Sequence, residues 1–207
     1  MQELSELYLS WIDCKKCTLC SGKKQVFSDG DINSRIFVIG EGPARYETAL
    51  GKPFVGPAGQ LLEAEFLKNG IKRNDLFLTN CVRGWPIDSA TGKTRQPSQQ
   101  EMDTCRPLLL AELDIIKPRF ILLAGGTAIK GVFNHKGSVS SIVGKWFKFR
   151  NIPTLATFHP AALLHSQTKA PDKYESLKAS FERDIKDISN CFHQEIAVVS
   201  QTTQTKF

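Results

Sequence analysis

Three cysteines near the start of the chain have the spacing of a metal site. Cys14, Cys17 and Cys20 form a C-x2-C-x2-C run, and Cys81 and Cys105 follow far downstream among the six cysteines of the chain. Thiolates at these intervals suit a zinc ion or an iron–sulfur cluster. The alternative is a set of buried thiols that pack as small apolar groups. The clustering of three cysteines in one short run favours a metal centre.

Polar and glycine-rich residues follow four short apolar runs farther along the chain. The runs end in GEGP at 40–43, TN at 79–80, AGGT at 124–127 and FHP at 158–160. Asn80 offers a donor and an acceptor from one amide, which suits the edge of an amide-like ligand, or else it caps a turn. His159 is able to bind a metal, carry a proton or donate to an anion, or else it is a buried histidine with satisfied hydrogen bonds.

The segment 40–59 is richer in glycine and proline than a connecting loop requires. It has five glycines and three prolines, a composition that exposes backbone N–H groups and stiffens the loop around a ligand. Phe54 lies between Pro53 and Val55. It either contacts the ligand of this loop or anchors the loop to the core.

The segments that position these residues alternate between strand and helix patterns. Compact apolar runs predict buried strands at 35–40, 75–82, 119–125 and 154–159. Helices are expected over 3–13, 57–70, 98–116, from 126 onward, and over 174–188, and the 98–116 helix starts with a Ser98–Glu101 capping box. This alternation predicts an α/β fold, a three-layer α/β/α sandwich with a central, mostly parallel four-stranded sheet. Ligands bind at the carboxyl ends of such strands, where the four motifs stand.

Composition limits the classes of protein to consider. The chain has 207 residues, of which 41% are hydrophobic and 23% charged, so we expect one globular domain over 1–193. The remaining residues, 194–207, carry no helix or strand pattern and are predicted to form a flexible tail. The net charge of +6 is a weak indication of a polyanionic partner.

The same pass along the chain argues against a membrane protein. No apolar run approaches the roughly 20 residues that span a bilayer. The amino-terminal segment is acidic and amphipathic rather than a signal or transit peptide. We therefore expect an intracellular, cytoplasmic protein that acts as a monomer.

In their order and distances, the motifs resemble those of family 4 uracil-DNA glycosylases, the iron–sulfur branch of that superfamily. The resemblance runs from about Asp13 to Lys186. It rests on CKKC (14–17), GEGP (40–43), GKPFVGPAGQLL (51–62), TN (79–80), CRP (105–107), GKWF (144–147) and FHPAALL (158–164). It implies an enzyme that flips uracil out of single- or double-stranded DNA, hydrolyses its N-glycosidic bond and leaves an abasic site.

The resemblance implies roles for the residues around the base. Phe54 stacks on uracil, and Asn80 hydrogen-bonds its N3–H and O4 edge, which cytosine presents with reversed polarity. Glu47 lies near the C5 edge and helps to exclude the methyl group of thymine. Gly40 and Gly42 belong to the same substrate-binding loop.

The resemblance also places the catalytic groups. His159, as a neutral imidazole that need not titrate, donates to uracil O2 as negative charge develops there, together with backbone N–H groups of the Glu41–Gly42 turn. The better-known branch of the superfamily has an aspartate where this chain has Gly42. Glu41 is the nearest carboxylate in sequence and is assigned to positioning the water.

Contacts with DNA are expected from two further segments. Leu163 or Leu164 wedges into the gap that the flipped nucleotide leaves, unless these leucines cap the core. His165 stands where the family commonly has an arginine, which puts one phosphate contact in doubt. The helix start at Gly126 and Thr127 offers free N–H groups to a phosphate.

Family members hold a 4Fe–4S cluster with four cysteines, and Cys14, Cys17 and Cys105 match three of them. The fourth is expected at Gly84, so we predict that Cys81 supplies it. Cys20, a non-cysteine ligand, or loss of the cluster are the alternatives. The role of the cluster would be structural.

Two other functions remain open from the sequence. One is a glycosylase-like module that binds DNA or a polymerase without excising a base. The other is a zinc-binding nucleotide hydrolase, which is disfavoured because no acidic cluster for Mg²⁺ follows any predicted strand. No lysine in the matched motifs is placed for Schiff-base chemistry, so a monofunctional glycosylase is expected.

Overall fold

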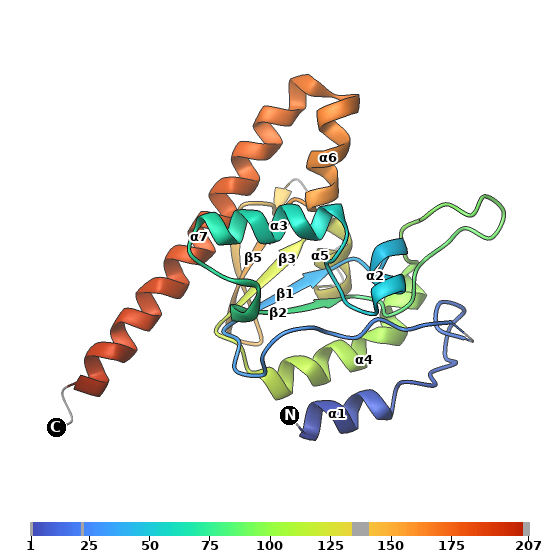
Figure 1. Ribbon diagram of the computed structural model, residues 1–207, viewed down its shortest axis with the longest axis horizontal. Helices are drawn as coiled ribbons and strands as arrows, with labels where there is room; N and C mark the ends of the chain where they lie inside the picture. Colours follow the sequence, from blue (N-terminus) through green and yellow to red (C-terminus); the bar gives the residue numbers. More distant parts are fainter. Residues whose placement is uncertain (1, 22, 134–140, 205–207) are drawn as a thin grey trace.

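A five-stranded sheet forms the centre of the protein in the computed structural model, which describes residues 2–21, 23–133 and 141–204 (Figure 1). The strand order is β2-β1-β3-β5-β4. The four strands predicted from the sequence are parallel, and β4 is antiparallel to β5 at one edge. The strands are β1 (Ile36–Gly40), β2 (Leu76–Asn80), β3 (Phe120–Ala124), β4 (Trp146–Phe149) and β5 (Ile152–Thr157).

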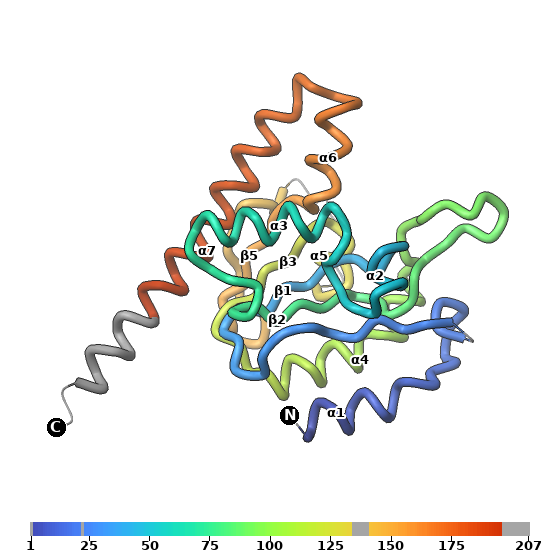
Figure 2. The backbone as a smooth tube through the Cα atoms, in the orientation of Figure 1, coloured from blue at the N-terminus to red at the C-terminus, as the bar shows by residue number. Residues whose placement is uncertain are grey.

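Helices cover both faces of the sheet, which confirms the predicted three-layer α/β/α architecture. One face carries α3 (Pro57–Lys68), α6 (Pro160–Lys169) and α7 (Pro171–Gln204). The other carries α4 (Gln99–Ile116) and α5 (Gly126–Phe133), with α1 (Gln2–Leu9) against α4. Helix α2 (Arg45–Leu50) and the short 3-10 turn η1 (Arg73–Asp75) lie in the connections. Helix α6 and the first half of α7 lie side by side and project from the body of the protein (Figure 2).

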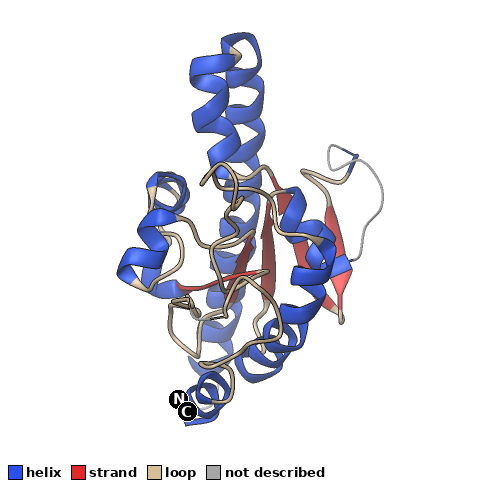
Figure 3. Ribbon diagram, turned by 90° about the vertical axis from the view of Figure 1, so that its right-hand side faces the viewer, coloured by secondary structure: helices blue, strands red, loops and turns tan. Residues whose placement is uncertain are grey.

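The sheet lies between two layers of helices (Figure 3). The apolar side chains of the strands alternate between two cores, one under each helical layer. In β1, Ile36 and Val38 pack toward α3 and α7, whereas Phe37 and Ile39 pack toward α4 and α5. All four are at most 1% exposed. Successive side chains of a strand point to opposite faces, so a strand between two helical layers is apolar throughout. This explains why the strands were recognisable as short continuous apolar runs.

The prediction of a four-stranded sheet was wrong by one strand. The motif GKWF enters β4, in which Trp146 and Lys148 are exposed and Phe147 and Phe149 are half-buried. An edge strand of four residues with one face in solvent has no continuous apolar run. The sequence signal used for the other strands therefore missed it.

The prediction for the carboxyl-terminal segment was also wrong in one respect. Helix α7 does not end near residue 188 but continues to Gln204, so the part of the predicted tail that is described is helical. Its 34 residues make it a long helix. None of the helices among the described residues, α7 included, is long and apolar enough to cross a membrane.

A buried ion pair joins three of these elements. Arg83, just after β2, donates to Glu112 of α4 at 2.6 Å, and their side chains are 1% and 0% exposed. Thr79 of β2 also donates to Glu112, at 2.8 Å, and Tyr8 of α1 donates to its other oxygen at 2.8 Å. The carboxylate of Glu112 thus holds β2, α4 and α1 together.

Removing the charge of Glu112 should destabilise the protein strongly, because the guanidinium of Arg83 would stay buried without a counter-ion. We expect Glu112→Gln to lower the free energy of unfolding by about 3 kcal/mol or more, measured by urea denaturation. Asp114→Asn is the matched control on the same helix, since Asp114 pairs with Arg150 at the surface, where their side chains are 66% and 44% exposed. The control should change stability by less than about 1 kcal/mol. Equal losses in the two variants would contradict this account.

Candidate active site

The carboxyl ends of the four parallel strands meet at one edge of the sheet. Gly40 pairs with Asn80 in the register of β1 and β2, and Ala124 pairs with Thr157 in that of β3 and β5. Strand β1 lies between β2 and β3. The connection into β2 runs through α3 on one face of the sheet, and the connection into β3 runs through α4 on the other face. Such a switch point is where open α/β sheets bind ligands.

Gly40 leaves the space in which Phe54 and Asn80 come together. A side-chain carbon at Gly40 would lie 2.4 Å from Asn80 Oδ1 and 2.6 Å from Phe54 Cζ. Any residue other than glycine would therefore displace the ring or the amide. Asn80 is 4% exposed, and its side-chain amide forms none of the hydrogen bonds found within the described part of the chain. The ring of Phe54 and the side-chain amide of Asn80 thus meet at Gly40, and the donors and the acceptor of that amide are unused within the described residues.

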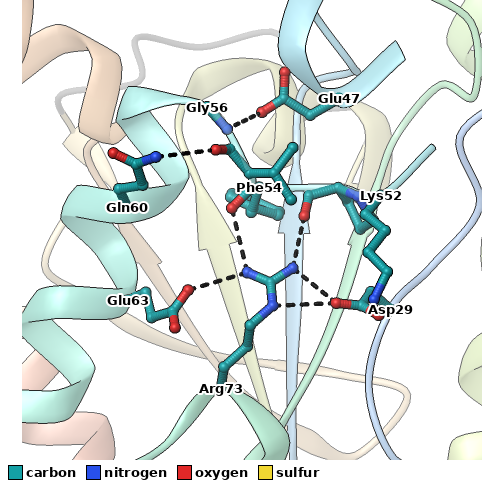
Figure 4. Close-up of polar contacts among 10 residues, drawn as sticks. Asp29, Glu47, Lys52, Phe54, Gly56, Gln60, Glu63 and Arg73 are labelled. Carbon is teal, nitrogen blue, oxygen red and sulfur yellow. Dashed lines mark hydrogen bonds and ion pairs between the residues drawn. The ribbon is translucent and has the colours of Figure 1, made fainter. Parts of the chain in front are cut away.

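Phe54 has a backbone conformation that other contacts must stabilise. Its φ is 54°, in the left-handed region that a bulky residue rarely adopts. The guanidinium of Arg73 donates to the carbonyl oxygens of Pro53 at 2.8 Å and Phe54 at 3.2 Å (Figure 4). It also pairs with Asp29 at 2.8 Å and Glu63 at 3.2 Å. Arg73 therefore fixes the backbone that aims the ring of Phe54.

Glu47 braces the same loop from its other side. Its Oε1 accepts from the N–H of Gly56 at 2.7 Å (Figure 4). Its Oε2 accepts from the N–H of Ala44 at 3.2 Å. Glu47 is buried, at 9% exposure. The described contacts make it a positioning residue for the loop, and its expected place beside the C5 edge of a base stays a prediction.

His159 begins helix α6 and is held as a neutral ring. Its Nδ1 accepts a hydrogen bond from the N–H of Ala161 at 3.2 Å, and Pro160 occupies the first position of the helix. Because Nδ1 is an acceptor, the proton of the neutral imidazole is on Nε2. Burial lowers the pKa of His159 from 6.5 to about 4, against a smaller opposing effect of Glu47. The ring packs on Gly125, at the end of β3, so its Nε2–H is a donor at the edge where the strands converge.

Glu41 is held by a residue to which the sequence assigned another role. Thr127 Oγ1 donates to Glu41 Oε2 at 2.5 Å. Burial raises the pKa of Glu41, and the hydrogen bond from Thr127 opposes this rise. The hydroxyl of Thr127 is thus directed at Glu41. The contact of a phosphate with the backbone N–H groups at Gly126 and Thr127 stays a prediction. The N–H of Gly42 donates to no acceptor within the described residues.

The structure separates the two leucines predicted to enter DNA. Leu163 is 2% exposed and packs in the core with Phe54 and Leu155, so the prediction of a wedge is wrong for Leu163. Leu164 is half-buried and His165 is exposed on the same turn of α6. Gly126 is half-buried at the start of α5. Of the pair, Leu164 is the one that a ligand can reach.

The cysteines gather differently from the predicted set. The thiols of Cys20 and Cys105 are within hydrogen-bonding reach, and Cys20 also interacts electrostatically with Cys14 and Cys17. Cys81 Sγ instead donates to the carbonyl oxygen of Thr127 in α5, at 3.7 Å. Burial raises the pKa of the Cys81 thiol to about 12. The prediction that Cys81 completes the metal site therefore disagrees with its orientation.

The distances between these side chains do not suit a single bound ion. Within the described residues, no three histidine, cysteine or acidic side chains are close enough together to hold one metal ion. A 4Fe–4S cluster differs in this respect, because each of its irons takes one cysteine thiolate and the ligands stand farther apart.

Two important residues were not found from the sequence. Arg73 and Asp29 lie outside every recognised motif, yet they fix the loop of Phe54. Their contact joins positions far apart in the chain, and no local pattern marks it. Only a chemical argument points to them: a loop that holds Phe54 at positive φ needs a hydrogen-bond donor from another segment for its carbonyl oxygens.

The sequence matches a known family along most of its length. The model of the uracil DNA glycosylase superfamily matches residues 27–186. This range contains the four strand ends, Phe54 and His159, and it leaves out Cys14, Cys17 and Cys20.

Individual relatives are similar over 81–91% of this chain. The chain is 30% identical to a type-4 uracil-DNA glycosylase of Pyrobaculum aerophilum, over 89% of this chain and 91% of the relative. It is 33% identical to a type-4 uracil-DNA glycosylase of Thermotoga maritima, over 81% and 86% of the two chains. It is 32% identical to that of Sulfurisphaera tokodaii, over 91% and 84%.

The ring of His159 should stay neutral until the pH falls to about 4. The unfolded chain takes up this proton near pH 6.5, so the contribution of His159 to stability is lost as the pH falls from 6.5 toward 4. NMR titration of the ring protons measures the pKa directly, with exposed His165 as the internal comparison. His159→Gln should remove part of the acid loss of stability. A His159 pKa at or above that of His165 would contradict the assignment.

Proposed function

This chain belongs to the uracil DNA glycosylase superfamily, and from this premise we propose that it is a type-4 uracil-DNA glycosylase. It removes uracil by hydrolysing the N-glycosidic bond and leaves an abasic site for base excision repair. The observation that carries the proposal is the meeting of the Phe54 ring and the Asn80 amide at Gly40, where that amide makes no hydrogen bond within the described residues. Those groups supply what a flipped pyrimidine needs, a stacking face and an edge reader.

Asn80 distinguishes uracil from cytosine by the polarity of its hydrogen bonds. Its Oδ1 accepts from N3–H of uracil, and its amide nitrogen donates to O4. Cytosine presents an acceptor and a donor at these positions, so both contacts would be mispaired in a buried site. Glu47 and Arg73 act one step away, by holding the loop that places Phe54 over the base.

His159 stabilises the leaving group. As the bond to the sugar breaks, negative charge builds on uracil O2, and the Nε2–H of the neutral ring donates to it. A donor fixed before the reaction needs no reorganisation when the charge appears. The N–H of Gly42, which donates to no acceptor within the described part of the chain, is a second donor. His159 thus works without changing its protonation state.

Glu41 orients the attacking water in this proposal. Its carboxylate lies at the same edge and is fixed by Thr127. Gly42 stands where the better-known branch of the superfamily has an aspartate, so Glu41 is the one carboxylate that the GEGP motif offers. The sugar develops oxocarbenium character, to which a neighbouring carboxylate is favourable.

DNA contacts come from α6 and the start of α5. Leu164 fills the gap in the base stack, while His165 and the backbone at Gly126 lie close to phosphates. The net charge of +6 favours this encounter. All proposed site residues come from one chain, so a monomer suffices, and both single- and double-stranded DNA are proposed substrates.

The cysteines suit a 4Fe–4S cluster, which we include in the proposal. Cys14, Cys17 and Cys105 are free thiols from two distant segments, and thiolates are the ligands that iron–sulfur clusters use. When bound, such a cluster cross-links the amino-terminal segment to α4. Hydrolysis of a glycosidic bond transfers no electron, so its role here is structural.

Asn80→Ala tests the assignment. Loss of two hydrogen bonds to the base should reduce excision by about 10²-fold or more. The measurement is strand scission by alkali of a labelled oligonucleotide that contains one uracil. Asn74→Ala is the matched control, because Asn74 is exposed in η1, the turn that precedes the same strand; it should retain full activity.

The outcomes separate the two classes of function. Scission by the wild type and Asn74→Ala, but not by Asn80→Ala, supports the enzyme and its base reader. No scission by a folded wild-type protein would leave a glycosylase-like binding module instead.

Leu164→Ala should slow excision from duplex DNA more than from single-stranded DNA. A wedge is needed only where a flipped base leaves a gap in a stacked duplex. We expect kcat/KM on duplex DNA to fall about tenfold or more, equal to roughly 1.4 kcal/mol. Leu67→Ala, on the exposed face of α3, serves as the control. Equal losses on the two substrates would refute the wedge.

A further inference from the structure

Four cysteines from two segments converge beside α4. Cys20 and Cys105 are 5% and 2% exposed, and their thiols are within hydrogen-bonding reach of each other. Cys14 and Cys17 lie near enough to interact with the Cys20 sulfur. All four are free.

The position of Cys20 depends on the absence of a side chain at Gly84. A side-chain carbon at Gly84 would lie 2.3 Å from the carbonyl oxygen and 2.6 Å from the carbonyl carbon of Leu19. The backbone at Leu19 therefore fills the volume in which a residue at position 84 would place its side chain. Leu19 itself is 2% exposed in the core. This packing brings the next residue, Cys20, to the side of Cys105.

Cys81 is directed elsewhere. Its Sγ contacts the carbonyl oxygen of Thr127 and packs on Gly131, both in α5. A thiol held between β2 and α5 would have to leave the core to reach Cys14 or Cys17.

We propose that Cys20 is the fourth ligand of the cluster, with Cys14, Cys17 and Cys105, and that it takes the place of a ligand from position 84. This inference rests on the cluster in the proposed function and assigns its remaining ligand. Each of the four cysteines would bind one iron as a thiolate, its proton having been lost to solvent. The backbone of Arg83 lies beside the sulfur of Cys105, and backbone N–H groups commonly donate to ligating sulfurs.

The assignment changes which segments the cluster joins. Three ligands come from 14–20 and one from α4, so the loop 84–98 is not anchored by an iron. That loop has contacts of its own instead. Trp85 Nε1 donates to Thr94 Oγ1 at 2.9 Å, and Arg95 pairs with Glu101 at 2.7 Å.

Cys20→Ser tests the assignment against Cys81→Ser as the matched control. Each variant replaces one buried sulfur with oxygen, and each is purified without oxygen in the full-length chain. The readouts are iron and acid-labile sulfide per chain and the visible absorption of the cluster. We expect Cys20→Ser to lose most of the iron and sulfide or to shift the absorption, and Cys81→Ser to match the wild type. The reverse pattern, or a wild-type spectrum and iron content in Cys20→Ser, would overturn the proposal.

A second variant guards against a folding defect. Cys20→Ala places a small apolar group in the buried position, and circular dichroism reports whether the variant folds. If it folds and lacks iron, the proposal stands; if it folds with full iron, the proposal fails. A wild-type protein without iron would likewise overturn it. Because iron and sulfide are measured apart from excision, an inactive protein that holds a Cys20-dependent cluster would count against the enzyme alone.

Discussion

The buried ion pair between Arg83 and Glu112 is the constraint on which the other features depend. It lies between the candidate active site and the cysteines, since Arg83 comes three residues after Asn80 and immediately before Gly84. Glu112 lies on the helix that carries Cys105. A charge pair without solvent tolerates little displacement, because any loosening leaves a charge uncompensated. The end of β2, which carries Asn80, and α4, which carries Cys105, are thereby held in one geometry.

The side chains of the proposed active site are held in place by internal contacts before any ligand binds. The ring of Phe54 is placed by a backbone conformation that Arg73 holds, and the imidazole of His159 is fixed by its own helix. These contacts are made to backbone groups, which leaves the reactive edges of both side chains unused. Preorganised donors stabilise charge without rearrangement at the moment of reaction. In the proposed reaction, the rigidity of the loop contributes to the chemistry as well as to the fold.

Local patterns predicted the elements whose cause is local. The buried strands were visible as apolar runs, and the capping box of Ser98 and Glu101 forms as expected. Gly40, Asn80 and His159 were found because strand ends meet at one edge. The predictions that failed concern features that no local pattern marks. Strand β4 has an exposed face, Leu163 is buried in the core with residues of α3 and α7, and Cys81 faces α5. Arg73 and Asp29 were missed because they hold the Phe54 loop through contacts between segments that are far apart in the sequence.

The contact between Leu19 and Gly84 has a consequence for how such a chain can change. The two positions are far apart in sequence but occupy one volume, so their substitutions are coupled rather than additive. A larger residue at 84 would expel the backbone at Leu19 and displace Cys20 with it. A shorter 17–20 segment would leave the space beside Gly84 empty. Neither change is neutral alone. The substitutions tolerated at one of these two positions therefore depend on the residue at the other, which is epistasis.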